Sequence, residues 1–538
     1  MATCAEVAAR TLYDEGVRQM YGLPGGEILD FIEAARAVGI EFTLVRDEGT
    51  AAFMADVQGQ MDRNPGVCVS TLGPGAMNMT LGVANAYLDR SPMIAVTASL
   101  STQAAPVATH QNLDLNGIYG KFTKMAITLD GTRTEEKVRE AFRTSLRPRM
   151  GPVHIAIPRD VGGEPEREGG APRHTESAVP QETSVPSREE LERMAQLLQD
   201  AERPVVVVGL DLHPHEDREA VLRFVESMGV PVFATPKAKG IVPEDHPLFH
   251  GVCAGVAGDS IIVELFEESD LLVGLGFEPV ESDKLWHHTM RMVNVGPVSI
   301  AADEYVPDHE CVGPVPEILD GLSSSIGSYQ WEEGRLEAFR NQLRSRLRPE
   351  GTRSGPGISP YELTLRLREL LPPETIHLTD VGSIKYITSQ AWKSFSPLTF
   401  FESNGLSSMG YAFPGAMALR KSRRAVPILA TVGDGGFGMR VAELETCIRE
   451  DLPFLTVVYN DNSLSLIRVA QESRGYPNYG VDYGPVDFAA VARGFGAWSR
   501  RVEALSEVDA AVKDALASGR PAVIDAVLDP AEYRAHAR

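Results

Sequence analysis

The sequence predicts an α/β protein with three doubly wound domains, each built on a parallel sheet. Short apolar runs rich in valine and isoleucine alternate with segments whose apolar residues recur at helical spacing. Many of the apolar runs end in glycine, proline or polar residues, as buried parallel strands do where they meet their loops. The length of 538 residues is enough for three domains of ordinary size.

The first domain is predicted over residues 1–165. Residues 5–17 have the spacing of an amphipathic helix, and the glycines and proline of residues 21–26 separate it from a second helix. Strands are expected at 42–45, 66–71, 92–97 and 151–158, with helices opening at residues 46–49 and after Gly73-Pro74-Gly75. Residues 161–188 are rich in Gly, Pro, Glu and Ser, and they predict a linker.

The middle domain is predicted over residues 186–345 and the third over residues 356–538. The middle domain is expected to be Rossmann-like, with strands at 203–210, 230–233, 271–276 and 298–301. Residues 346–360 predict a second linker. The third domain is expected to have strands at 375–379, 427–432 and 455–459, a helix within 440–451, and a helical cover at 464–479.

Composition excludes several classes of protein. The chain is 43% hydrophobic and 23% charged, as globular proteins are. Its net charge of −23 disfavours nucleic acid or an anionic membrane as a partner. Its five cysteines form no close pairs, so neither a zinc site nor a disulfide framework is indicated. We expect a cytoplasmic enzyme, because the sequence lacks a signal peptide pattern and an apolar run of transmembrane length.

Two motifs follow neighbouring strands of the third domain. Gly433-Asp434-Gly435-Gly436 ends the strand at 427–432, and Asn460-Asp461-Asn462-Ser463 ends the strand at 455–459. Because both strands of a strand–helix–strand unit deliver their carboxyl ends to one edge, we expect the motifs to meet there. Glycines let an anion approach the backbone, and a carboxylate, a second oxygen ligand and a diphosphate suit Mg²⁺. An ordinary Asp-Gly turn is the alternative.

These motifs resemble the metal and diphosphate motif of thiamine-diphosphate-dependent enzymes. The resemblance implies that Mg²⁺ is held by Asp434, Asp461 and the carbonyl group of Ser463. It also implies diphosphate contacts from Gly433, Gly435, Gly436, Gly382 and Ser383. The family usually has Asn at the place of Asp461, so this chain adds a negative charge beside the diphosphate. Asn462 is the competing metal ligand.

Three features of the first domain resemble the pyrimidine-binding domain of the acetolactate synthase branch. They are residues 21–26, which include Pro24 and Gly25, then Glu48, and then residues 71–76, which include Gly73. The resemblance implies that Glu48 hydrogen-bonds N1′ of the aminopyrimidine, and it adds Asn78 to the cofactor-binding residues. Glyoxylate carboligases lack this glutamate. Taken alone, Glu48 is an acidic residue favoured at a helix start.

The resemblance assigns roles to four further positions. His110 and Gln111 lie in a polar stretch like the loop that covers the thiazolium, although a surface turn is the alternative. Ser407 is implied to bind the cofactor, and Met409 is implied to be the apolar wedge beneath it, although methionine is usually simple core. Ile467 falls where family members line the substrate pocket; yeast-type pyruvate decarboxylases have glutamate there.

The resemblance implies decarboxylation of a 2-oxo acid and transfer of the acyl-anion equivalent to a carbonyl acceptor. It also implies a homodimer or homotetramer with active sites between subunits. The alternatives are a decarboxylase that releases an aldehyde and a cofactor-binding homologue without catalysis; the apolar Ile467 favours ligation. Some family members hold FAD in the middle domain. The strand end Gly209-Leu210-Asp211 and the lack of arginine after Gly276 predict that this chain holds none.

Overall fold

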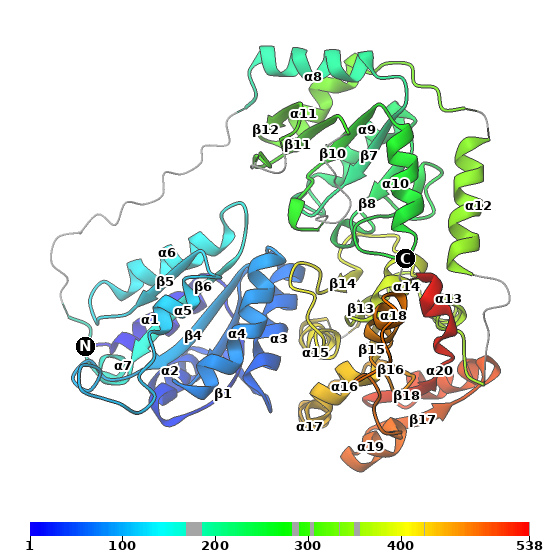
Figure 1. The fold of residues 1–538 in the computed structure, drawn as a ribbon. Helices are drawn as coiled ribbons and strands as arrows, with labels where there is room; N and C mark the ends of the chain where they lie inside the picture. Colours follow the sequence, from blue (N-terminus) through cyan, green and yellow to red (C-terminus); the bar gives the residue numbers. More distant parts are fainter. Residues whose placement is uncertain are drawn as a thin grey trace. The chain divides into compact units, whose positions relative to one another are not determined.

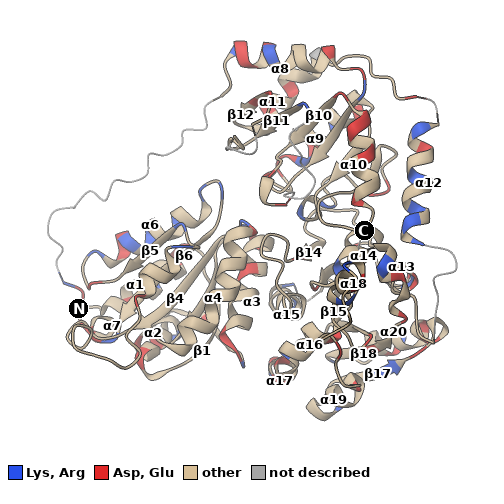
Figure 2. Ribbon diagram, viewed as in Figure 1, with Lys and Arg blue, Asp and Glu red and all other residues tan. Residues whose placement is uncertain are grey.

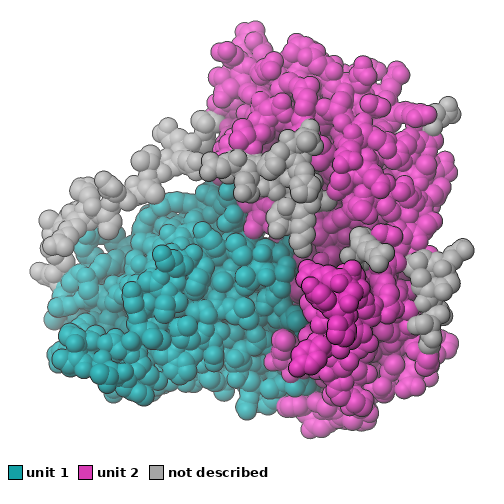
Figure 3. Space-filling view, in the orientation of Figure 1, with its two compact units in different colours: residues 1–179, 403–424, 440–453 teal, residues 180–402, 425–439, 454–538 magenta. Residues whose placement is uncertain are grey.

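The computed structural model describes residues 1–167, 185–281, 290–301, 306–332, 334–348, 356–423 and 425–536. Both predicted linkers therefore lie partly outside the described residues. The first overlaps helix α7 (Arg159–Gly163), and the second begins inside helix α12 (Arg335–Leu347). The chain forms two compact units, which Figure 3 colours separately. Unit 1 comprises 1–179, 403–424 and 440–453, and unit 2 comprises 180–402, 425–439 and 454–538.

Three six-stranded parallel sheets confirm the predicted fold class (Figure 1). The first, in unit 1, has the order β2-β1-β3-β4-β6-β5, and its strands are β1 (Gln19–Leu23), β2 (Glu41–Leu44), β3 (Gly66–Ser70), β4 (Met93–Ser99), β5 (Met125–Thr128) and β6 (Pro152–Pro158). The second, in unit 2, has the order β12-β11-β10-β7-β8-β9, and its strands are β7 (Pro204–Val208), β8 (Val232–Ala234), β9 (Phe249–Val252), β10 (Leu271–Leu275), β11 (Met292–Gly296) and β12 (His309–Val312). The third, also in unit 2, has the order β14-β13-β15-β16-β18-β17, and its strands are β13 (Ile376–Thr379), β14 (Phe400–Glu402), β15 (Ile428–Gly433), β16 (Leu455–Asn460), β17 (Trp498–Val502) and β18 (Ala522–Val527).

Helices cover the sheets through apolar faces. Those near the first sheet are α1 (Cys4–Asp14), α2 (Leu29–Val38), α3 (Glu48–Asp62), α4 (Pro74–Leu88), α5 (Leu115–Tyr119), α6 (Thr134–Leu146), α7 and α15 (Ala412–Ser422). Those near the second are α8 (Arg188–Asp200), α9 (Arg218–Met228), α10 (Asp259–Glu268), α11 (Val315–Leu322) and α12. The others are α13 (Pro360–Leu370), α14 (Ser383–Ala391), α16 (Asp434–Arg440), α17 (Leu444–Arg449), α18 (Ser465–Ser473), α19 (Phe488–Phe495), α20 (Val508–Ala517) and α21 (Tyr533–His536).

Continuous apolar cores join these layers. The core of the first sheet takes residues from α1, α2 and α6, and α3 packs against α4, β3 and α15. The middle sheet packs against α8, α9 and α11 in one core, and against α10 and α12 in another. The third sheet packs against α13, α14 and α20. Strands such as β3, β7 and β10 are buried along their whole length, which explains their uninterrupted apolar sequences.

One predicted strand is wrong, and several were not predicted. Residues 298–301 form no strand; the chain pairs instead through β11 (Met292–Gly296), and 298–301 lie in the loop that follows. The strands without a prediction are β1, β5, β9, β11, β12, β14, β17 and β18. Short strands at the sheet edges, such as β5 and β12, are only partly buried, so their sequences lack the continuous apolar signal.

The strand orders place a topological switch point in each sheet. Because the first strand of each sheet pairs with a strand from the next βαβ unit, the switch points lie between β1 and β3, between β7 and β10, and between β13 and β15. Open α/β sheets bind ligands in the crevice outside the carboxyl ends of the strands at such points. Functional residues are therefore expected in the loops that follow these six strands.

Charge is distributed over many helices. Figure 2 shows acidic residues on α10, basic residues on α12 and both signs on α8. All five cysteines are buried and free. Among the described residues, none of the helices has the length and apolar character needed to cross a membrane.

Candidate active site

At the switch point of the first sheet, the loops after β1 and β3 touch. Pro24 and Gly25 follow β1, and Thr71 to Gly73 follow β3. A Cβ atom on Gly25 would lie 2.5 Å from the Cβ atom of Thr71, so a larger residue there would separate the loops. Gly73 has a φ of +63°, a conformation that favours glycine. The predicted residues Pro24, Gly25 and Gly73 therefore lie at one place in unit 1.

Glu48 is buried where α3 begins, beside the same switch point. Glu48 is only 5% exposed, and its Oε2 atom accepts a hydrogen bond from Nδ2 of Asn78 at 3.1 Å. A Cβ atom on Gly75 would lie 2.8 Å from Glu48 Oε1, so glycine makes room for the carboxyl group. Asp47 caps α3 by accepting a hydrogen bond from the backbone N–H of Thr50 at 3.2 Å. α3 and α4 thus hold one buried carboxyl group in a fixed direction.

The loop with His110 and Gln111 contributes one side chain to this place. Gln111 has a φ of +55°, and its side chain would lie 3.1 Å from a Cβ atom on Gly73. His110 is exposed and makes no hydrogen bond with any described residue. Nδ2 of Asn112 donates to the carbonyl groups of Ala105 and Ala108 at 2.9 and 3.0 Å, which ties the loop to itself. Gln111 is therefore brought to the switch point, whereas His110 faces solvent.

Sequence reasoning missed a second carboxylate at this switch point. Oε2 of Glu27 accepts a hydrogen bond from the hydroxyl group of Thr71 at 2.9 Å, and Glu27 is half-buried. The signal available in the sequence was its position directly after residues 21–26, the segment that resembles the pyrimidine-binding domain. The carboxylates of Glu27 and Glu48 thus both lie beside the segment that follows β3, the first at Thr71 and the second at Gly75.

Ser407 and Met409 lie in the segment of unit 1 that precedes α15. Ser407 has a φ of +55°, and its hydroxyl group donates to the carbonyl oxygen of Asn404 at 2.8 Å. The backbone N–H of Gly405 donates to Oδ1 of Asp89 at 2.7 Å, just after the end of α4. Met409 is half-buried. Hydrogen bonds to the end of α4 therefore fix the backbone that presents Met409.

In unit 2, the turn after β13 has features that suit a diphosphate. Gly382 has a φ of +133° and open space where a Cβ atom would stand. Ser383 begins α14, and its hydroxyl oxygen is buried without a hydrogen-bond partner. Gly433 ends the neighbouring strand β15, and it too has open space around its Cβ position. A helix N-terminus with an unpaired buried hydroxyl group suits an anion.

Asp434 and Asp461 form the candidate metal site. Oδ1 of Asp434 accepts the backbone N–H of Gly435 at 2.6 Å, whereas Oδ2 is buried and accepts no hydrogen bond of normal geometry from any described residue. Burial raises the pKa of Asp434 to about 6. Burial and the neighbouring charge of Asp434 raise the pKa of Asp461 to about 7, although Asp461 accepts hydrogen bonds from Ser463 N at 3.0 Å and Ser465 Oγ at 2.8 Å. A divalent cation would relieve this repulsion and use the unpaired oxygen, so the residues fit Mg²⁺.

The loop after β16 leaves the predicted carbonyl ligand available. Nδ2 of Asn460 donates to Oδ1 of Asp525 at 2.8 Å, so Asn460 serves to end the strand. The hydroxyl group of Ser463 donates to the carbonyl oxygen of Val481 at 3.1 Å. The carbonyl oxygen of Ser463 accepts no hydrogen bond from any described residue. Asn462 has a φ of +57°, which turns the loop between the two candidate ligands. This arrangement favours Ser463 over Asn462 as the third ligand.

Ile467 lies on α18, the helix that follows the metal loop. It is 48% exposed, so its side chain is available to a bound molecule. The helix starts at Ser465, whose hydroxyl group donates to Oδ2 of Asp461. The metal loop and the helix that carries Ile467 are thus joined by a direct hydrogen bond.

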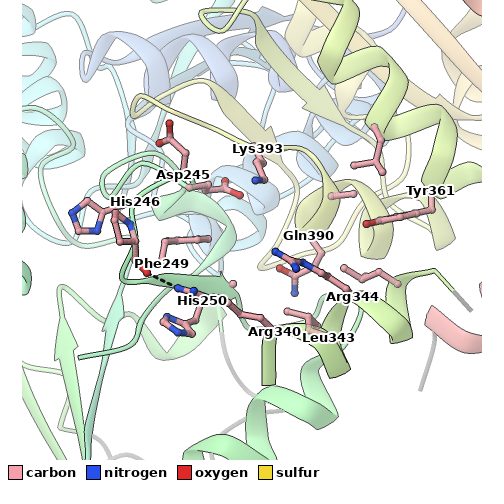
Figure 4. Close-up of a pocket in the computed structure, with 16 residues that line it drawn as sticks. Asp245, His246, Phe249, His250, Arg340, Leu343, Arg344, Tyr361, Gln390 and Lys393 are labelled. Carbon is pink, nitrogen blue, oxygen red and sulfur yellow. Dashed lines mark hydrogen bonds between the residues drawn. The ribbon is translucent and has the colours of Figure 1, made fainter. Parts of the chain in front are cut away.

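A separate cavity of about 390 Å³ lies elsewhere in unit 2 (Figure 4). It is lined by residues 244–247 and 249–251, by Arg340 and Arg344 of α12, by Tyr361 of α13 and by Gln390 of α14, among others. None of the predicted site residues lines it. The cavity and the residues at the switch points are therefore different places.

Comparisons with known proteins agree with this geometry. Residues 2–118 match the family model "Thiamine pyrophosphate enzyme, N-terminal TPP binding domain", residues 191–322 match its central domain, and residues 380–526 match its C-terminal TPP binding domain. The first and last matches contain the candidate residues described above for the first and third sheets.

Curated relatives are similar along almost the whole chain. A probable acetolactate synthase large subunit of Methanocaldococcus jannaschii is 29% identical, over 98% of this chain and 92% of that protein. The acetolactate synthase of Bacillus subtilis is 26% identical, over 98% of this chain and 93% of that protein. The catabolic acetolactate synthase of Raoultella terrigena is 26% identical, over 98% of this chain and 95% of that protein. This chain belongs to the thiamine pyrophosphate enzymes, and it is an acetolactate synthase-like member of that family.

Proposed function

We propose that this protein uses thiamine diphosphate to decarboxylate a 2-oxo acid and transfers the resulting acyl-anion equivalent to a carbonyl acceptor. One observation carries the cofactor site: after the switch-point strand β15, Oδ2 of Asp434 is buried close to Asp461 and accepts no hydrogen bond of normal geometry from any described residue. Similarity to acetolactate synthases over 98% of the chain favours ligation over simple decarboxylation or a silent homologue.

The residues of unit 1 act on the pyrimidine end of the cofactor. When bound, thiamine diphosphate supplies the carbon atom that adds to the 2-oxo acid and accepts the electron pair left by carbon dioxide. Glu48 shares a proton with N1′ of the aminopyrimidine, which requires a buried carboxyl group held in one direction. Asn78 provides that orientation through its hydrogen bond to Oε2. Gln111 lies against Gly73 at the same edge, where it can contact substrate.

The residues of unit 2 hold the diphosphate end. Asp434, Asp461 and the Ser463 carbonyl group provide three oxygen ligands for Mg²⁺, which usually completes its coordination with phosphate oxygens and water. The diphosphate is bound by Gly382 and Ser383 on one side of the switch point and by residues 433–436 on the other. Ser383 supports this role through its unpaired buried hydroxyl group.

A homodimer or homotetramer with active sites between subunits is part of the proposal. Its support is the family resemblance. Light scattering of the active protein, at the concentration used for assays, tests it. A species with the mass of two or four chains is expected, and an active monomer would contradict the subunit arrangement.

Turnover of single 2-oxo acids tests the reaction. Pyruvate is the first compound to try, because its ligation to a second pyruvate gives acetolactate, the product named in the relatives. The protein is incubated with each acid, with and without thiamine diphosphate and Mg²⁺, and products are identified by NMR. We expect carbon dioxide and a ligated hydroxy-keto acid only when the cofactor is present. Release of a free aldehyde as the main product would contradict ligation.

A further inference from the structure

The switch point of the middle sheet lies between β7 and β10, which pair directly. The loops that flank it are residues 209–212 after β7 and residues 276–281 after β10. In doubly wound sheets, a dinucleotide places its phosphate groups on backbone N–H groups of such loops. A ligand therefore needs both free N–H groups and space in this crevice.

The N–H groups of the loop after β7 already have partners within the protein. The bonds run from Gly209 N to Leu275 O at 2.9 Å, from Leu210 N to Glu281 Oε2 at 3.2 Å, and from Asp211 N to Gly276 O at 2.9 Å. The two loops thus bond to each other across the crevice. A phosphate group could use these donors only after breaking those bonds.

Glu281 accepts two further donors beside the crevice. Its carboxylate also accepts the hydroxyl group of Thr235 at 2.6 Å and the backbone N–H of Lys237 at 3.2 Å, both from the loop after β8. Glu281 is 5% exposed. One buried carboxylate therefore receives backbone and hydroxyl donors from the loops of two neighbouring strands, which is the set of contacts that a bound phosphate receives.

The crevice also lacks space. A Cβ atom on Gly209 would lie 2.5 Å from the carbonyl oxygen of Gly276, so the two loops touch through their backbones. Gly276 has a φ of +60°, and its Cβ position would lie 2.6 Å from the backbone nitrogen of Leu212. Leu212 is 1% exposed and belongs to the core of the middle sheet. Close packing of the two loops therefore adds to the hydrogen bonds between them and leaves little space for a ligand.

We infer that Glu281 occupies the place of a ligand phosphate, so that the middle domain contains an anion-binding cradle filled by the protein itself. FAD does not fit this crevice while Glu281 is in place. The inference goes beyond the proposed reaction, because it concerns a site that decarboxylation and ligation do not use. Its tests measure binding and stability, so they stay independent of whether the proposed reaction is correct.

The first test uses the unaltered protein and needs no variant. The full chain is purified with thiamine diphosphate and Mg²⁺, its absorbance spectrum is recorded, and its unfolding midpoint is measured with and without added FAD. We expect no flavin absorbance and no shift of the midpoint. Flavin that copurifies with the protein, or a midpoint raised by FAD, would overturn the inference.

The second test vacates the cradle. Glu281→Ala leaves the N–H groups of Leu210 and Lys237 and the hydroxyl group of Thr235 without their acceptor, so the unfolding midpoint should fall. Sulfate at millimolar concentration can accept the same hydrogen bonds. We therefore expect sulfate to restore part of the lost midpoint in this variant, and chloride at the same ionic strength to restore none.

Leu212→Ala is the matched control. It weakens packing at the same crevice but keeps Glu281, so sulfate should shift its midpoint no more than that of the unaltered protein. This control removes the general stabilisation that sulfate gives by exclusion from protein surfaces. An equal sulfate shift in all three proteins would mean that no anion cradle exists there, and the inference would fail.

Discussion

The two sheets of unit 2 are both parallel and doubly wound, but they differ in strand order and in the loops at their switch points. In the middle sheet, Glu281 and the opposing loop take the donors, and Leu212 fills the crevice. In the third sheet, Ser383 Oγ and Asp434 Oδ2 are buried, and neither makes a hydrogen bond of normal geometry within the described part of the chain. Buried polar atoms are normally hydrogen-bonded, so unpaired atoms at a switch point indicate a ligand. A doubly wound parallel sheet therefore supports either a binding site or a closed structural domain, depending on its loop residues.

The largest effect on cofactor binding should come from removing a candidate metal ligand after β15. Asp434→Ala removes the unpaired oxygen and one of two metal carboxylates, so the metal no longer bridges the protein to the diphosphate. We expect the affinity for thiamine diphosphate with Mg²⁺ to fall by more than the roughly 10- to 100-fold typical of changing an outer-sphere partner. Isothermal titration calorimetry measures it.

Asp482→Asn is the control for this change. It removes a carboxylate from the segment beside the metal loop, where Asp482 pairs with Arg468 and accepts a long hydrogen bond from the hydroxyl group of Ser463, not from its carbonyl group. Its cofactor affinity should stay close to that of the unaltered protein. Unchanged affinity in Asp434→Ala would show that the unpaired oxygen has no role in binding.

The next effect concerns the switch point of unit 1, where α3 and α4 hold the buried carboxyl group of Glu48. Glu48→Gln keeps the hydrogen bond to Asn78 possible but removes the proton that Glu48 shares with N1′. Cofactor affinity should change little, because the diphosphate and metal dominate binding. Turnover should fall by roughly 10²- to 10⁴-fold, the usual contribution of general acid–base groups.

Two measurements separate the roles of Glu48. Consumption of the 2-oxo acid reports turnover, and exchange of the cofactor C2 proton into D₂O reports activation of the cofactor. Both should slow in Glu48→Gln. Exchange at the unaltered rate would reduce Glu48 to a residue that begins a helix.

A smaller effect is expected from Asn78→Ala. The variant removes the hydrogen bond that orients Glu48, and a typical hydrogen bond contributes about 0.5–1.5 kcal/mol. If Asn78 acts only through Glu48, kcat should fall by about tenfold at most. A loss as large as that of Glu48→Gln, measured in the same assay, would mean that Asn78 also contacts the cofactor directly, as the family resemblance implies.

Sequence alone predicted the open switch points better than the closed one. Asp434, Asp461 and Glu48 stand in motifs whose spacing is local, and buried strands such as β15 and β16 have clear apolar runs. Glu281 gave no signal, because its partners Leu210, Thr235 and Lys237 lie 44 to 71 residues away. The wrong strand at 298–301 has a related cause, since sheet pairing rather than local sequence decides between two adjacent apolar runs.

Glu27 was missed for a simpler reason. It directly follows residues 21–26, the segment that resembles the pyrimidine-binding domain. Only the hydrogen bond from Thr71 shows that its side chain lies at the switch point of the first sheet. The relation of Gln111 to Gly73 likewise depends on a left-handed residue in a loop, which composition does not reveal. Tertiary contacts of loops therefore account for most of what the sequence left open at the site.

The smallest effect on cofactor affinity should come from removing the negative charge of Asp461. The open switch point has one more carboxylate than the family usually places there, and Asp434 and Asp461 repel each other across a buried loop. Asp461→Asn keeps an oxygen that can bind the metal and accept the N–H of Ser463. Its amide nitrogen can donate to Ser465 Oγ, so the existing hydrogen bond is reversed and retained.

We therefore expect Asp461→Asn to bind thiamine diphosphate and Mg²⁺ within about tenfold of the unaltered protein, a difference below about 1.4 kcal/mol. The loss of one metal-bound charge and the relief of repulsion between Asp434 and its neighbour act in opposite directions, which keeps the net change small. Calorimetry on this variant beside Asp434→Ala gives the result. A loss as severe as that of Asp434→Ala would show that the metal needs both negative charges.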